Sequence, residues 1–133
     1  MKQFFIVFLF FIVIQSLPII NSDEVNTKIK GNRFVTIFYS LDSCIHCKEL
    51  KPVLEEVEKE KTKNNDQFEL YNVDCTNGGC NYNAFPQLIF YRDGKEFSSY
   101  TGMKKSTTIL NWIHRNMIEP FGKIGSDEIE DLQ

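Results

Sequence analysis

Two cysteines, Cys44 and Cys47, enclose Ile45 and His46 and have the spacing of a redox pair. If they begin a helix, positions i and i+3 lie on one side, so the two sulfurs can close a disulfide. The first sulfur then lies at the helix N-terminus, where unpaired N–H groups and the helix dipole favour a thiolate. His46 can donate to that thiolate or place charge near it, which makes the disulfide more oxidising. We therefore predict thiol–disulfide exchange, with Cys44 as nucleophile, Cys47 as resolving thiol and His46 as a third candidate catalytic residue.

The elements around this motif must place it between a buried strand and a helix. Residues 34–39 are nearly all β-branched or aromatic, which is typical of a central strand buried on both faces. Apolar residues from Leu50 to Val57 recur at helical spacing and predict a helix that begins at the cysteine motif. The other predicted elements are a short helix, a second strand, a hairpin with an Asp-Gly turn and a last helix, at residues 23–30, 68–73, 87–100 and from 106. This order predicts an α/β fold, a small mixed sheet flanked by helices.

The first 22 residues have the pattern of a secretory signal peptide. A positive charge precedes an apolar run from Phe4 to Ile14, and Pro18 and the small residue Ser22 follow it. The run is shorter than the roughly 20 residues that span a bilayer, although an uncleaved signal anchor is the alternative. The sequence thus predicts a signal peptide at 1–22, one domain at 23–119 and an acidic, disordered tail at 120–133.

The charge balance argues against two classes of partner. The 133 residues include 15 Lys and Arg against 18 Asp and Glu, a formal net charge of −3. The chain therefore lacks the basic excess of nucleic-acid-binding proteins and a basic run that would dock on an anionic membrane. We expect neither nucleic acid nor, once the signal peptide is removed, a membrane among its partners.

Several short motifs occur in the order found in one known family. They are Phe38-Tyr39, Cys44 to Pro52, Val73-Asp74-Cys75-Thr76, Phe85-Pro86, Tyr91 to Lys95 and Tyr100-Thr101-Gly102. The chain resembles the thioredoxin superfamily over residues 24–117, and most of all a single thioredoxin domain of the protein disulfide isomerase group. The resemblance implies a thioredoxin-like fold. Because little chain precedes Phe34 after a cut at Ser22, we expect this fold to lack its first edge strand.

The resemblance also implies residues that bind the substrate. Pro86 corresponds to a cis proline beside the active-site sulfurs, and the backbone at Phe85 would pair with a client peptide as an added strand. From the residues alone, Pro86 is more simply interpreted as a proline that starts a strand. The family often places a buried carboxylate on the central strand to take the proton of the resolving thiol. Counting back from Phe38 gives Ile37, which is apolar. Four residues separate Tyr39 from Cys44, one more than is usual in the family; if this longer loop shifts the register, Asp42 serves through water instead.

The second pair of cysteines, Cys75 and Cys80, allows three interpretations. Two intervening glycines allow a turn that brings the sulfurs together, so the pair is a candidate structural disulfide. A second redox pair and two free buried thiols are the other possibilities. Together with the Cys44–Cys47 pair, these cysteines also have the spacing of zinc ligands, but an oxidising compartment disfavours four free thiolates. We expect no metal and no cofactor beyond the redox-active disulfide.

The function implied by these features is that of a thiol–disulfide oxidoreductase, similar to protein disulfide isomerase. It would form, reduce or isomerise disulfides in secretory-pathway proteins, in the endoplasmic reticulum lumen or after secretion, since no KDEL-type retrieval signal is seen. Expected partners are cysteine-containing client polypeptides, with glutathione or another oxidoreductase as redox partner, and we expect a monomer. The alternative is a chaperone or adaptor of the same fold whose redox site is slow or inactive.

Overall fold

The computed structural model describes residues 16–118. In chain order, its elements are β1 (Ile19–Ile20), the 3-10 turn η1 (Ser22–Glu24), α2 (Val25–Gly31), β2 (Phe34–Ser40), α3 (Ile45–Asn64), β3 (Glu69–Asp74), β4 (Gln87–Arg92), β5 (Lys95–Ser99) and α4 (Ser106–Met117). The first 15 residues of the predicted signal peptide and the predicted tail at 120–133 lie outside the described residues. Between residues 16 and 118, the helices are all too short or too polar to cross a membrane.

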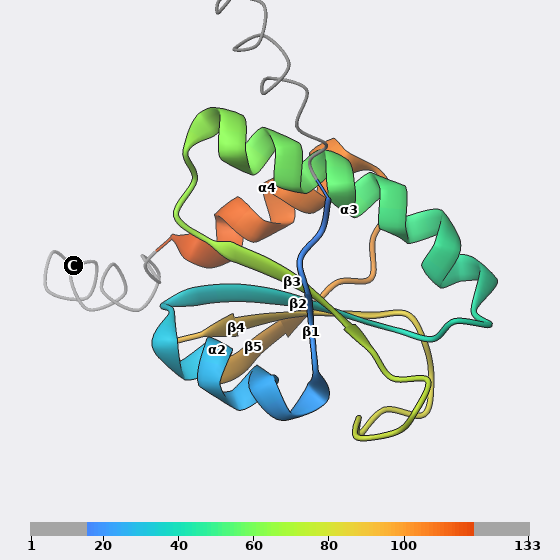
Figure 1. Cartoon of the computed structure of the whole chain (residues 1–133). Coiled ribbons are helices and arrows are strands. Elements are labelled where there is room, and N and C mark those ends of the chain that lie inside the picture. Colours follow the sequence, from blue (N-terminus) through green and yellow to red (C-terminus); the bar gives the residue numbers. More distant parts are fainter. Residues whose placement is uncertain (1–15, 119–133) are drawn as a thin grey trace, which may run out of the picture.

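The strands form one mixed sheet in the order β1-β3-β2-β4-β5. Strand β2 lies at the centre, parallel to β3 and antiparallel to β4, and each of its residues is buried. Helices α3 and α4 cover one face of the sheet and α2 covers the other (Figure 1). These observations confirm the predicted mixed sheet with helices on both faces, and the central strand is the one that leads to the cysteine motif.

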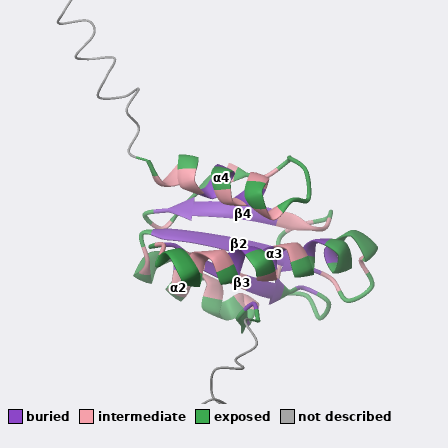
Figure 2. Ribbon diagram, turned by 90° about the horizontal axis from the view of Figure 1, so that it is seen from above, coloured by how far each residue is buried: buried purple, intermediate pink, exposed green. Residues whose placement is uncertain are grey.

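Alternate side chains of β2 belong to two separate hydrophobic clusters. Phe38 packs with Leu54 of α3 and Ile113 of α4 in a cluster that we call the α3 side. Ile37 packs with Ile29 of α2 and belongs to a second cluster, which we call the α2 side. Figure 2 shows the buried strands between their more exposed helices. A strand with apolar residues on both faces is held from both sides, so the end of β2 is a rigid platform for the loop that follows.

The first edge strand is present, contrary to the expectation from the sequence. Ile19 and Ile20 pair in parallel with Asn72 and Val73 of β3. Leu17 is only 4% exposed, and the backbone N–H of Asn72 donates to the carbonyl of Pro18 over 2.8 Å. The segment that resembles the end of a signal peptide therefore also contributes apolar side chains to both sides of the sheet.

The connection from β3 to β4, residues 75–86, contains no helix or strand. Gly78 and Gly79 both have positive φ, 90° and 87°, a conformation that suits glycine. They form the turn that brings Cys80 back to Cys75, and the chain then reaches Phe85 and β4. The connection ends at the edge of the sheet where β2 also ends, because Gln87, the first residue of β4, is paired with Tyr39 near the end of β2.

Candidate functional site

Cys44 is the N-cap residue of α3, directly after the loop that leaves β2. Its backbone is extended, with φ −86° and ψ 112°, and its N–H donates to the carbonyl of Leu41 over 3.2 Å. The backbone N–H of Cys47 donates to the Cys44 sulfur over 3.1 Å. The sulfur thus occupies the place of an N-cap oxygen and accepts from one of the unpaired N–H groups of the first helical turn.

The two sulfurs of the motif are joined as a disulfide between Cys44 and Cys47. Cys47 is buried, 3% exposed, within the α3-side cluster, whereas Cys44 is partly exposed at its edge. A reagent from solution can therefore reach Cys44 more readily than Cys47. This difference in access is what an attacking and a resolving thiol require.

His46 is exposed on the first turn of α3, and its ring meets two charged side chains. Its Nδ1 lies 3.0 Å from Oε1 of Glu49 and 3.1 Å from Nζ of Lys104, and Lys104 donates to Glu49 over 2.8 Å. Hydrogen bonds from Lys104, and then from His46, hold the pKa of Glu49 below its usual value. The sequence analysis did not identify Glu49 or Lys104. Glu49 was detectable from its i,i+3 spacing to His46, but no local signal links Lys104 to a residue so far along the chain.

The predicted substrate-binding pair lies near the disulfide. The peptide bond between Phe85 and Pro86 is cis, as the family resemblance implies. Phe85 is partly buried and packs against the α3-side cluster, as Cys44 does. Since β4 begins one residue after Pro86, beside the end of β2, the cis peptide bond and the cysteine motif share one end of the sheet.

A hollow of about 300 Å³ includes Cys47 in its wall. Besides Cys47, its wall includes both Asp42 and Asp74. The hydroxyl and N–H of Thr76 both donate to Asp74 and keep its pKa below the usual value. Asp42 and Cys47 therefore border the same hollow, and the role of Asp42 in taking the proton of Cys47 through water stays a prediction.

The position counted from the sequence for a buried carboxylate, Ile37, points to the wrong face. Ile37 belongs to the α2-side cluster, whereas Phe38 packs with Cys47 in the α3-side cluster. Side chains alternate along a strand, so a shift of one residue exchanges the two faces.

The second disulfide joins Cys75 to Cys80 on the α2 side of the sheet. Cys80 borders a hollow of about 510 Å³ together with Tyr39 and Tyr91, whose hydroxyl groups lie 2.6 Å apart. Cys47 and Cys75 belong to different clusters, so the sheet separates the buried ends of the two disulfides. The structure therefore does not combine the four cysteines into one site.

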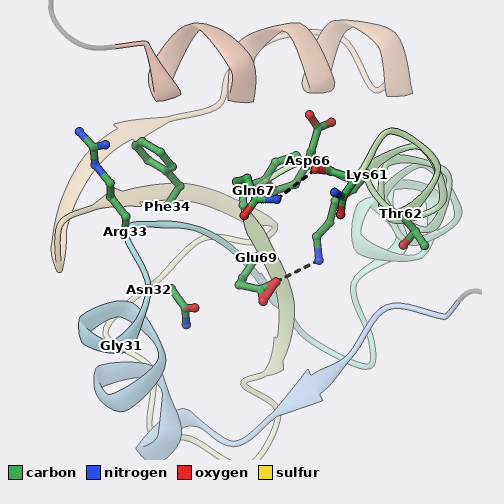
Figure 3. Close-up of a pocket in the computed structure, with 11 residues that line it drawn as sticks. Gly31, Asn32, Arg33, Phe34, Lys61, Thr62, Asp66, Gln67 and Glu69 are labelled. Atoms are coloured by element: carbon green, nitrogen blue, oxygen red, sulfur yellow. Dashed lines mark hydrogen bonds and ion pairs between the residues drawn. The ribbon is translucent and has the colours of Figure 1, made fainter.

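A third hollow, of about 650 Å³, lies at the other end of the sheet (Figure 3). Residues that begin β2 and end α3, among them Phe34 and Thr62, line it, and Lys61 donates to Glu69 over 2.9 Å at its edge. None of the sequence-predicted site residues borders this hollow. Over residues 16–118, no three or more His, Cys, Asp or Glu side chains lie together as metal ligands would.

The chain is similar to known proteins in both sequence and structure. A family model described as Thioredoxin matches residues 16–115. Protein disulfide-isomerase 1 of Caenorhabditis elegans is 23% identical over 125 residues, covering 90% of this chain and 26% of that protein. The thioredoxin domain-containing protein 5 homolog of Drosophila melanogaster is 26% identical over 102 residues, covering 73% and 24%. A crystal structure of human ERp44 superimposes with a TM-score of 0.71 at 16% identity, covering 81% and 31%. The chain spans about a quarter of the length of such curated relatives.

Proposed function

The chain belongs to the thioredoxin family, and we propose that it is a thiol–disulfide oxidoreductase similar to protein disulfide isomerase. The observation that carries the proposal is the Cys44–Cys47 disulfide at the N-terminus of α3, with one accessible and one buried sulfur. The relatives named as protein disulfide-isomerases support the same class of reaction.

The exchange takes place in two substitutions at sulfur. In the reduced chain, the Cys44 thiolate attacks one sulfur of a client disulfide, and the other client sulfur leaves as a thiolate that takes up a proton. Cys47 then loses its proton and attacks the Cys44 sulfur, which restores the Cys44–Cys47 bond and releases the second client thiolate. Two electrons pass from the chain to the client. The reverse sequence oxidises a client dithiol, and no cofactor other than the disulfide takes part.

The cis peptide bond at Pro86 is proposed as the place where client polypeptides bind. Phe85 lies outside β4, which begins at Gln87, so its N–H and carbonyl groups would pair with an extended client segment, as the family resemblance implies. The clients are cysteine-containing polypeptides, and glutathione or another oxidoreductase would restore the redox state of the pair.

We place this activity in the secretory pathway. The apolar segment at the start of the sequence and two disulfides in so short a chain both suit an oxidising compartment. Because Leu17 and Ile20 are buried in the folded domain, we propose that the signal peptide ends before Leu17 and not at Ser22.

Reduction of insulin by dithiothreitol, followed by turbidity, tests the proposed activity. The unchanged chain should accelerate it, and Cys44→Ser should remove the acceleration. His114→Asn is the matched control, because His114 lies on α4 and bonds to Asp66 instead of a site residue. A chain that captures clients as mixed disulfides without accelerating the reduction would be an adaptor, and the proposed activity would be wrong.

A further inference from the structure

The contacts of His46 with Glu49 and Lys104 join two parts of the chain that are far apart in sequence. His46 and Glu49 lie on the first turns of α3, and Lys104 lies in the loop between β5 and α4. All three pairwise distances are within hydrogen-bonding range, 2.8 to 3.1 Å. The loop from β5 thus contacts the helix turn that carries the active disulfide.

The loop that carries Lys104 is held in place by its own contacts. The Tyr100 hydroxyl donates to the carbonyl of Met103, and the Tyr100 ring lies 5.1 Å from that of Trp112. A Cβ at Gly102 would lie 2.6 Å from the Tyr100 hydroxyl, so glycine lets the loop close over this side chain. Lys104 is therefore presented to α3 by an anchored turn.

The two partners of Nδ1 require opposite protonation states. An ammonium group only donates, so a hydrogen bond from Lys104 to His46 requires an unprotonated Nδ1. A carboxylate only accepts, so a hydrogen bond from His46 to Glu49 requires a protonated Nδ1. With Nδ1 bare, the neutral ring carries its proton on Nε2; in the imidazolium both nitrogens are protonated, and Nδ1–H can then donate to Glu49.

We propose that Glu49 and Lys104 are positioning residues that keep Nε2 of His46 protonated in both charge states, so that Nε2–H can donate to the Cys44 thiolate. This inference rests on the proposed function, since it concerns the thiolate that attacks clients. Lys104 selects the Nε2–H form of the neutral ring, and Glu49 accepts from Nδ1–H when both ring nitrogens are protonated. Within residues 16–118, neither Lys48 nor Lys105 forms a hydrogen bond with the ring.

The proposal predicts an effect on the Cys44 thiolate. A hydrogen bond to a charged sulfur stabilises the reduced state and makes the disulfide more oxidising. Without Lys104, the neutral ring can place its proton on Nδ1, facing Glu49, and Nε2 then has no proton to donate. We expect Lys104→Met to raise the midpoint of thiolate formation by about 0.5 pH units, a roughly threefold change in the equilibrium.

Nitrogen-15 NMR of the reduced chain tests the proposal directly. At a pH where the ring is neutral, the shifts of Nδ1 and Nε2 report which nitrogen carries the proton. We expect Nε2–H in the unchanged chain, in Glu49→Gln and in the matched control Lys105→Met, but a shift toward Nδ1–H in Lys104→Met. His46→Ala identifies the signals, since the chain has only two histidines.

Two outcomes separate this inference from the proposed activity. The positioning role is wrong if Lys104→Met keeps the proton on Nε2 and has the same midpoint of thiolate formation as Lys105→Met. This holds even if insulin reduction is normal. If the tautomer changes as expected but the unchanged chain does not accelerate insulin reduction, the positioning role stands and the oxidoreductase activity is wrong.

Discussion

The backbone N–H of Cys47 donates to the sulfur of Cys44, so each cysteine of the pair contributes to the other's environment. Cys47 supplies a donor to the sulfur that caps the helix, while its own sulfur is buried against apolar side chains of the α3 side. A donor and a helix N-terminus favour the anion at Cys44, and burial disfavours it at Cys47. The difference between the two thiols therefore comes from their positions on one helical turn.

Substitution of each cysteine should give a different product with clients. Attack on a client disulfide needs only Cys44, whereas release needs Cys47. We therefore expect Cys47→Ser to accumulate mixed disulfides with a test protein that carries non-native disulfides, and Cys44→Ser to accumulate none. Non-reducing gel electrophoresis after alkylation measures both. Equal amounts of mixed disulfide from the two variants would reverse the assigned roles.

Removal of the second disulfide should lower stability but leave the chemistry. The Cys75–Cys80 bond closes a short loop on the α2 side, and closing such a loop contributes about 2 kcal/mol to the free energy of unfolding. We expect the Cys75→Ala, Cys80→Ala double variant to lose about that amount in urea denaturation. Its insulin reduction at 25 °C should stay within twofold of the unchanged chain; a loss of activity in a folded variant would connect this disulfide to catalysis.

The residues of β1 should contribute measurably to stability. Burial of an aliphatic side chain such as Leu17 or Ile20 stabilises a fold by about 1.5–3 kcal/mol. A chain that begins at Asn21 loses both side chains and should therefore unfold with a free energy about 3–6 kcal/mol below one that begins at Leu17. Ile19→Ser is the matched control for Ile20→Ser, since Ile19 is 64% exposed and its loss should change little. Equal free energies of unfolding for the two chains would show that β1 does not contribute to stability.

Stability should fall in alkaline solution because of the buried tyrosines. Burial raises the pKa of Tyr39 to about 12, and burial and the hydrogen bond with Tyr39 raise that of Tyr91 further. The unfolded chain releases these protons near pH 10. The contribution of both groups is therefore complete below about pH 10 and is lost as the pH rises toward 12. Urea denaturation at several pH values, with absorbance at 295 nm, should show this fall, and Tyr39→Phe should make it shallower.

The element pattern of the fold was readable from the sequence because its signals are local. The apolar run at 34–39, the Asp93-Gly94 turn and the helical spacing after Cys47 each specify one element, and the structure confirms all three. The edge strand β1 was missed because Ile19 and Ile20 also fit the apolar segment of a signal peptide. Two residues carry too little pattern to distinguish these roles, and only pairing with β3 does so.

Residue spacing alone predicted only the part of the site that lies within one helical turn. The motif from Cys44 to Cys47 places both sulfurs and His46 by spacing alone. The face on which a β2 residue lies is set by its pairing with β3 and β4, which the count to Ile37 could not supply. Lys104 reaches the site through the tertiary fold, and no spacing in the sequence predicts such a contact.

Phe85 packs against both hydrophobic clusters, one on each side of the sheet. The side chain of the residue just before Pro86 therefore contacts the hydrophobic clusters on both sides of the sheet. Its backbone lies at the end of the sheet that carries the Cys44–Cys47 disulfide. Changes behind the sheet, in α2 or around Tyr39, can displace Phe85 without touching a sulfur. If Phe85 binds clients as proposed, substitutions on the far side of the sheet should change client preference while the geometry of the Cys44–Cys47 pair stays constant.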